Sequence, residues 1–208
     1  LLKRGIRLLA GGQGSEAVKV LELARHADPA SVRIGVELAR AYLHVQKLGM
    51  ARKILKETLA SSAATAEEKV RGREVLAEVL LAEGNLEAAK QACAPLLEGG
   101  AASAVSRRIS GMIAYREGDS ERALSELNEA ATLDPGDAET RTALGLALLQ
   151  AGDLPGAAAA LEEAVRLDPG SHSAVSNLAK VYDRQGRDAD AAAARQRFQE
   201  IEEIRSLA

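Results

Sequence analysis

The sequence is short of aromatic residues, proline and cysteine. Trp is absent, aromatic residues make up 2% of the 208 residues, and there are 5 prolines and one cysteine, Cys93. One cysteine cannot form a disulfide within the chain, and a lone cysteine is most often a small buried apolar residue. The scarcity of proline favours an all-helical protein, because proline breaks helix interiors. Alanine supplies much of the 47% hydrophobic share, and it is the best helix former.

The charges nearly balance, which argues against a nucleic-acid-binding surface. The chain has 27 Lys and Arg against 30 Asp and Glu, a net charge of -3, whereas nucleic-acid binders usually carry a basic excess. No apolar run approaches the roughly 20 residues that span a bilayer. The sequence begins with Leu1 and not with Met. We therefore expect a fragment of a longer protein, and its location, cytoplasmic or exported, is left open.

Two series of small residues recur at a nearly constant spacing. Their members are Gly5, Ala39, Ala77, Gly111, Gly145 and Ala179, and then Ala17, Ala51, Ala89, Ala123, Ala157 and Ala191. In both series the steps are 34, 38, 34, 34 and 34 residues. Self-similarity at this period is the signature of a repeat protein. The small residues predict places where two helix backbones approach closely, and a larger side chain there would cost about 1–3 kcal/mol.

The unit 138–171 shows best what is repeated. Leu144 and Leu148 lie four residues apart on a first apolar stripe, as in a helix. Gly152 interrupts this helix, and Pro169 follows the end of a second one. We expect each unit to be a helix, a tight turn and a second helix. The units cover residues 1–31, 32–69, 70–103, 104–137, 138–171 and 172–208. The step of 38 places four extra residues within 61–68, which either lengthen a helix by a turn or loosen the connection.

These residues resemble the tetratricopeptide repeat family. The match in the best-preserved unit consists of Leu144-Gly145, Leu148, Gly152, Ala157, Leu161, Ala164 and Pro169. Leu148 replaces the usual Tyr, and the usual Trp position is held by Gly35, Arg73, Arg107, Arg141 and Val175. The resemblance covers essentially the whole chain. It implies an all-α fold, a right-handed α-α superhelix of about six helix-turn-helix units, and the alanine-rich style is similar to bacterial members.

The last unit departs from the pattern. Phe198 stands where the family usually has Ala, and Ile201, Ile204 and Leu207 follow it. We expect this last helix to close the stack, since terminal units of repeat arrays are atypical caps. The alternative is that its apolar face docks onto a partner or a second copy.

Residues arranged for catalysis or metal binding are not evident. His26, His44 and His172 fall in three different units and do not have the spacing of metal ligands. The glycine-rich stretch 11–14 fits the turn of the first unit, because neither a strand before it nor a Lys-Ser/Thr after it is present. We therefore expect a protein that is not an enzyme and that holds no cofactor and no metal.

The resemblance implies a binding groove lined by the first helix of each unit. The candidate groove residues are Arg40, His44, Glu78, Arg108, Met112, Tyr115, Arg116, Leu146, Leu149, Lys180 and Arg184. The ends of this set are charged and its middle is apolar, which suits an extended or helical segment with one or two apolar anchors. The alternative is that the apolar residues pack between neighbouring first helices. Arginines at such sites could bind carboxylates, but the family's carboxylate clamp is incomplete, because Thr142 and Leu146 occupy sites that should join Asn177.

We therefore expect a scaffold that binds a peptide segment or a partner protein in its groove, with no nucleic-acid partner. A first alternative is a substrate-recruiting module of a larger enzyme or regulator. A second is a structural protein of an envelope system that self-associates end to end.

Overall fold

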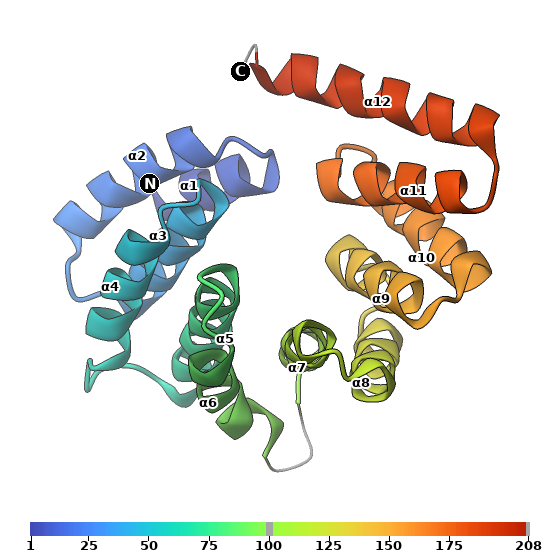
Figure 1. The fold of residues 1–208 in the computed structure, drawn as a ribbon. Coiled ribbons are helices and arrows are strands. Elements are labelled where there is room, and N and C mark those ends of the chain that lie inside the picture. Colours follow the sequence, from blue (N-terminus) through green and yellow to red (C-terminus); the bar gives the residue numbers. More distant parts are fainter. Residues whose placement is uncertain (99–101, 207–208) are drawn as a thin grey trace. The chain divides into compact units, whose positions relative to one another are not determined.

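The computed structural model describes residues 1–98 and 102–206. Within these two ranges the chain forms twelve α-helices that follow one another in pairs (Figure 1). The prediction of an all-α protein built from helix pairs is confirmed. The chain divides into two compact units, residues 1–100 and residues 101–208, and each contains three helix pairs. That the two units form one continuous array remains a prediction from the repeat spacing.

The bounds of the helices follow the repeat. The first unit contains α1 (Leu2–Ala10), α2 (Gly14–Ala27), α3 (Val32–His44), α4 (Leu48–Leu59), α5 (Ala66–Ala82) and α6 (Leu86–Leu97). The second unit contains α7 (Ala104–Glu117), α8 (Ser120–Leu133), α9 (Ala138–Ala151), α10 (Leu154–Leu167), α11 (His172–Arg184) and α12 (Asp188–Ser206). The odd-numbered helices are the first helices of their pairs and the even-numbered ones are the second.

Most helices begin at a residue whose side chain accepts a hydrogen bond from a backbone N–H of the first turn. These N-caps are Ser31, Thr65, Asn85, Ser103, Asp119, Asp137, Asp153 and Ser171. Such a cap stabilises a helix by about 1 kcal/mol. At α5 the cap is reciprocal, because Glu68 Oε2 also accepts a hydrogen bond from the Thr65 backbone N–H at 3.0 Å.

The turn within each pair requires one residue with a left-handed backbone. Gly12, Gly84, Gly118, Gly152 and Gly186 have φ between 70° and 86°, and Gln46 has φ 59° at the equivalent place. These positions have the same steps as the small-residue series. Glycine suits them because it has no Cβ to clash in this conformation. Gln46 is the one residue with a side chain that adopts it in the described part of the chain.

The irregular step of 38 residues lengthens a helix. Helix α9 begins seven residues before Gly145, whereas α5 begins eleven residues before Ala77. The additional turn thus lies at the start of α5, where the Thr65 cap fixes it. Of the two expectations for residues 61–68, the longer helix is confirmed.

The small residues lie where helices pack most closely. The six alanines of the second series are all fully buried. A Cβ on Gly145 would lie 2.5 Å from Cγ of Leu161, and one on Gly111 would lie 2.6 Å from Cγ of Leu127. Neither leucine has exposed surface. The close approach of the two helices in a pair, predicted from the spacing of small residues, is confirmed.

Within each unit, a second helix that is followed by another pair also packs against the first helix of that pair: α2 against α3, α4 against α5, α8 against α9, and α10 against α11. Leu127 of α8 belongs to one buried cluster with Ala143, Leu144 and Ala147 of α9. In the same way Leu161 of α10 is buried in a cluster with residues of α11. First helices of neighbouring pairs also contact each other: α1 with α3, α3 with α5, α7 with α9, and α9 with α11. Within each unit the first helices therefore lie side by side.

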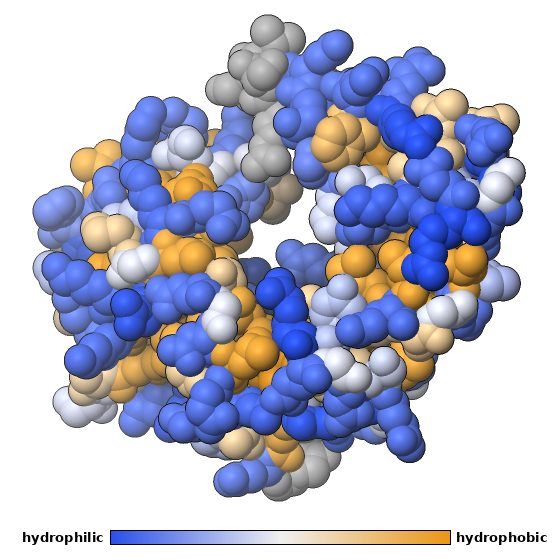
Figure 2. Space-filling model, viewed as in Figure 1, coloured by the Kyte–Doolittle hydropathy of each residue, from blue (hydrophilic) through white to orange (hydrophobic). Residues whose placement is uncertain are grey.

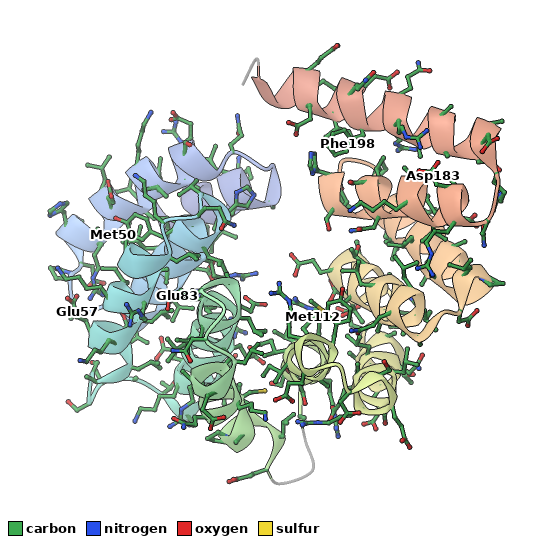
Figure 3. The ribbon with its side chains drawn as sticks, viewed as in Figure 1. Met50, Glu57, Glu83, Met112, Asp183 and Phe198 are labelled. Carbon is green, nitrogen blue, oxygen red and sulfur yellow. The ribbon has the colours of Figure 1, made fainter. Side chains whose placement is uncertain are left out.

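The last pair ends in a longer helix. The side chain of Phe198, a residue of α12, points toward α11 (Figure 3). Its ring centroid lies 4.0 Å from that of His172. His172 Nε2 lies 3.0 Å from Glu202 Oε1. Ile204 is 70% exposed, and Leu207 lies outside the described residues. That α12 closes the stack remains a prediction.

Candidate functional site

The candidate site is the exposed side of three neighbouring first helices in the second unit. We call it the first-helix face and define it by the exposed or partly exposed residues Arg108, Met112, Tyr115 and Arg116 of α7, Leu146, Leu149 and Gln150 of α9, and Lys180 and Arg184 of α11. Residues 34 apart occupy equivalent places on neighbouring helices. Met112, Leu146 and Lys180 therefore form one row, and Arg116, Gln150 and Arg184 form another.

Two contacts fix how these helices are aligned. Arg108 Nη2 on α7 lies 3.0 Å from Glu139 Oε2 at the start of α9. Arg184 Nη1 on α11 donates a hydrogen bond of 3.4 Å to the backbone carbonyl of Leu149 on α9. The structure thus brings the candidate residues of α7, α9 and α11 together on one face, in the register that the repeat predicts.

The apolar residues of the face have a second role in the core. Met112 and Tyr115 are partly buried and pack against the cluster that contains Leu144, and Leu149 packs against the cluster that contains Leu178. Leu146 is partly exposed and belongs to neither cluster. These side chains therefore pack between helices and also keep some surface accessible. Figure 2 shows hydrophobic residues among hydrophilic ones around α9 and α10, and Figure 3 labels Met112 on α7.

Arg108 is engaged within the chain. Its side chain is 15% exposed, and it pairs with Asp137 Oδ2 at 3.5 Å as well as with Glu139. Both carboxylates come from the start of the neighbouring first-helix segment. The sequence suggested that this arginine could bind carboxylates, and the carboxylates it contacts in the structure are internal.

Three other cations of the face are not paired with a carboxylate of the described residues. Arg116, Lys180 and Arg184 are exposed, and Lys180 Nζ donates to Asn177 Oδ1 at 3.2 Å. Asp183, the acidic neighbour on α11, instead forms an ion pair with Arg195 of α12, and Figure 3 shows it between these helices. The exposed charge of the first-helix face is consequently positive.

In the first unit the candidate residues lie on α3 and α5. Arg40 is exposed and lies 3.9 Å from Glu37. His44 is exposed and lies against the start of α2, because a Cβ on Gly14 would be 2.6 Å from His44 Nδ1. Glu78 is partly buried and has an interaction within the chain. Here the candidate residues form a mixed set of charges, and the partly exposed Leu43 and Leu81 lie at the positions equivalent to Tyr115 and Leu149.

The sequence interpretation missed two equivalent hydrogen bonds between pairs. The Tyr42 hydroxyl donates to Glu22 Oε1 at 2.6 Å, and the Tyr182 hydroxyl donates to Glu162 Oε1 at 2.8 Å. Burial, and next the hydrogen bond to the carboxylate, raises the pKa of each tyrosine to about 12. The signal was present in the sequence, since both tyrosines follow their glutamate by 20 residues.

One arginine at the usual tryptophan position is also explained. Arg107 lies 3.0 Å from Glu126 Oε2 and 3.1 Å from Glu129 Oε2, both on the second helix of its own pair. The hydrogen bond that Arg107 donates to the Glu126 carboxylate raises the pKa of Arg107 above its ordinary value. An ion pair therefore joins α7 to α8 where the family more often has an aromatic ring.

In residues 1–98 and 102–206, His, Cys, Asp and Glu side chains do not gather in groups of three that could hold a metal ion. Among the helices of these same ranges, none is both long enough and apolar enough to cross a membrane.

The family model described as "Tetratricopeptide repeat" matches residues 74–138 and 142–201, which is more than half of the chain. The fold is similar to that of a chain in the crystal structure of the APC/C hetero-tetramer Cut9-Hcn1, with a TM-score of 0.80 and 17% identity. Human IFIT1, solved as a dimer with PPP-AAAA, also gives a TM-score of 0.80 and 17% identity. A comparison with curated proteins by sequence gave no match.

A third structure is similar in size to this chain. It is YrrB, described as a TPR protein with an unusual peptide-binding site, with a TM-score of 0.54, 18% identity, 88% of this chain covered and 93% of that one. The match to the Cut9-Hcn1 structure covers 96% of this chain but 39% of that chain, and the match to IFIT1 covers 95% and 49%. At these identities the structures show the fold alone. The family match and the paired helices together show that the chain belongs to the tetratricopeptide repeat family, which is usually non-catalytic and generally serves as a protein-interaction module.

Proposed function

We propose that the first-helix face of the second unit binds a polypeptide segment of a partner protein. The observation that carries this proposal is a group of partly exposed apolar side chains on two neighbouring helices, Met112, Tyr115, Leu146 and Leu149. Exposed polar and charged residues border this group. Apolar anchors with a polar rim are the usual composition of a protein-binding surface. The same role applies whether the chain acts alone or recruits a substrate for a larger enzyme or regulator.

The face is preformed, which favours binding. Its helices are held by fully buried side chains such as Ala123, Leu127 and Leu161, so that little order has to be created when a partner binds. Met112 supplies a flexible side chain that adapts to irregular shapes. Tyr115 is of a residue type enriched among the contacts that dominate binding energy. The described peptide-binding site of YrrB, a protein of similar fold, also supports a peptide ligand.

The test uses a phage-displayed library of random nonapeptides selected on the purified chain. We expect wild-type protein to enrich peptides, and the double variant Met112→Glu with Leu146→Glu to lose them while its helical circular dichroism is kept. Two carboxylates in place of the apolar anchors would leave buried apolar peptide side chains facing a charge. Retention of the enriched peptides by a folded double variant would show that this face is not the site.

Two further variants keep the test clear. Leu146→Glu alone serves if the double variant fails to fold, because Leu146 lies outside the buried clusters. The control carries Leu23→Glu and Leu133→Glu, which place two carboxylates on second helices, where these leucines are 58% and 57% exposed. We expect the control to bind as wild type does.

A further inference from the structure

We infer that the segment bound by the first-helix face is extended, with acidic side chains near both of its ends and an apolar side chain between them. This inference rests on the proposed function and names the chemistry of the partner.

The charge of the face differs from that of the whole chain. The chain has a net charge of -3, yet Arg116, Lys180 and Arg184 leave the face with exposed positive charge. The acidic residues nearby are compensated, because Glu139 pairs with Arg108 and Asp183 pairs with Arg195. A partner with carboxylates would meet cations that the chain itself does not neutralise.

The cations are placed in two groups at opposite sides of the face. Arg116 lies on α7, whereas Lys180 and Arg184 lie one turn apart on α11. Two like charges four residues apart destabilise a helix. A carboxylate bound between Lys180 and Arg184 would relieve this repulsion, so this pair is a second and stronger anchor for an acidic side chain.

The spacing of these groups sets the length of the ligand. Packed helices lie about 8–10 Å apart, so Arg116 and Arg184, two helices apart at equivalent positions, are separated by roughly 20 Å. An extended chain advances about 3.3 Å per residue, so about six residues cover this distance. Leu146 and Leu149 lie between the two groups on α9, where they meet an apolar side chain in the middle of the segment.

The face recognises charged side chains and not a chain terminus. Asn177 Nδ2 donates to the carbonyl of Ser173 at 2.9 Å, and Thr142 Oγ1 donates to the carbonyl of Ala138 at 2.8 Å. Both polar groups are therefore used inside their own helices. The acidic residues of the partner can accordingly lie anywhere along its sequence.

The experiment repeats the nonapeptide selection with a variant in which the three cations are neutralised. Peptides enriched by wild-type protein should carry an excess of Asp and Glu about six residues apart, on both sides of an apolar residue. The variant Arg116→Gln, Lys180→Gln, Arg184→Gln should lose this acidic excess. Each lost cation should weaken binding of a synthetic consensus peptide about twofold to fivefold, as is typical of exposed ion pairs, and added salt should weaken wild-type binding.

A matched control separates this effect from a general change of charge. Lys3→Gln, Lys53→Gln and Lys56→Gln remove three exposed cations from α1 and α4, and this control should select the same acidic peptides as wild type. Enriched peptides without an acidic excess, or an excess that survives in the Arg116, Lys180 and Arg184 variant, would overturn the inference and leave the proposed function standing. An absence of enrichment by wild-type protein, or enrichment that Leu146→Glu does not reduce, would overturn the proposed function itself.

Discussion

Replacing Gly145 by alanine perturbs the closest contact between α9 and α10. The added Cβ would lie 2.5 Å from Leu161 Cγ and 2.9 Å from Leu161 Cδ2, and Leu161 has no exposed surface. Overpacking of this kind costs about 1–3 kcal/mol. Alanine recovers about 0.8–1.0 kcal/mol through its higher helix propensity. In the second helix pair Ala39 and Leu55 occupy the equivalent positions, so two helices can be spaced to accept this contact, and the cost belongs near the middle of the range, at about 2 kcal/mol. We expect Gly145→Ala to lower the free energy of unfolding by about 1 kcal/mol.

The chain itself offers a compensating partner. At the positions equivalent to 145 and 161, the third pair has Ala77 and Cys93, both buried. Leu161→Cys alone removes buried methyl groups and should destabilise by about 2 kcal/mol, the lower limit for a Leu to Ala change. In the double variant the new Cβ occupies part of the space that Leu161 leaves. The double variant should therefore be more stable than the sum of the single changes by about 1 kcal/mol, a coupling typical of residues in contact.

Urea unfolding followed by circular dichroism measures these differences. Because repeat arrays can unfold in parts, hydrogen exchange of the α9 and α10 amides should accompany it and report the local change. Strictly additive effects, or a Gly145→Ala variant as stable as wild type, would refute the idea that close backbone approach at Gly145 depends on the missing side chain.

Two further predictions concern the turns and the tyrosines. Gln46→Gly should raise the free energy of unfolding by about 0.5–1 kcal/mol, because a left-handed backbone costs a residue with a side chain about 1–2 kcal/mol and the greater chain entropy of unfolded glycine offsets part of the gain. Gly118→Ala, at φ 80°, should lower the free energy of unfolding. An unchanged urea midpoint in Gln46→Gly would show that Gln46 is unstrained. Tyr42 and Tyr182, whose pKa values are raised to about 12, stay protonated in the folded state while the unfolded state loses the proton from about pH 10. Stability should therefore be unaffected by these groups below pH 10 and fall between pH 10 and 12, by no more than about 1.4 kcal/mol per pH unit for each tyrosine. The double variant Tyr42→Phe, Tyr182→Phe should lose less stability over this interval than wild type. The same pH slope in this variant and in wild type would contradict the role of the two hydroxyls. The control is Tyr115→Phe, which should keep the pH slope of wild type.

The repeat period was sufficient to predict the helix pairs, the turns at Gly118 and Gly152, and the close approach at Gly145, because small residues recur at the same places in successive units. The partners of Arg108 were not predictable in this way. They lie on a neighbouring pair, and a distance of 3.0 Å to Glu139 depends on how two helices slide past each other, which residue spacing does not specify. The double role of Met112 was likewise undecided from the sequence, because its place on the helix surface is compatible with both packing and exposure.

The side chain of Arg195 in α12 affects whether a further helix pair could stack on the second unit. It occupies the position at which Leu127 and Leu161 are buried against the next first helix, and its side chain is instead 56% exposed and paired with Asp183. A further helix pair stacked here in the same manner would have to strip water from a guanidinium and a carboxylate, a penalty of several kcal/mol per ion. Extension of the stack by an engineered seventh pair would first require Arg195→Leu, together with a small residue at Phe198 in place of the ring that covers His172.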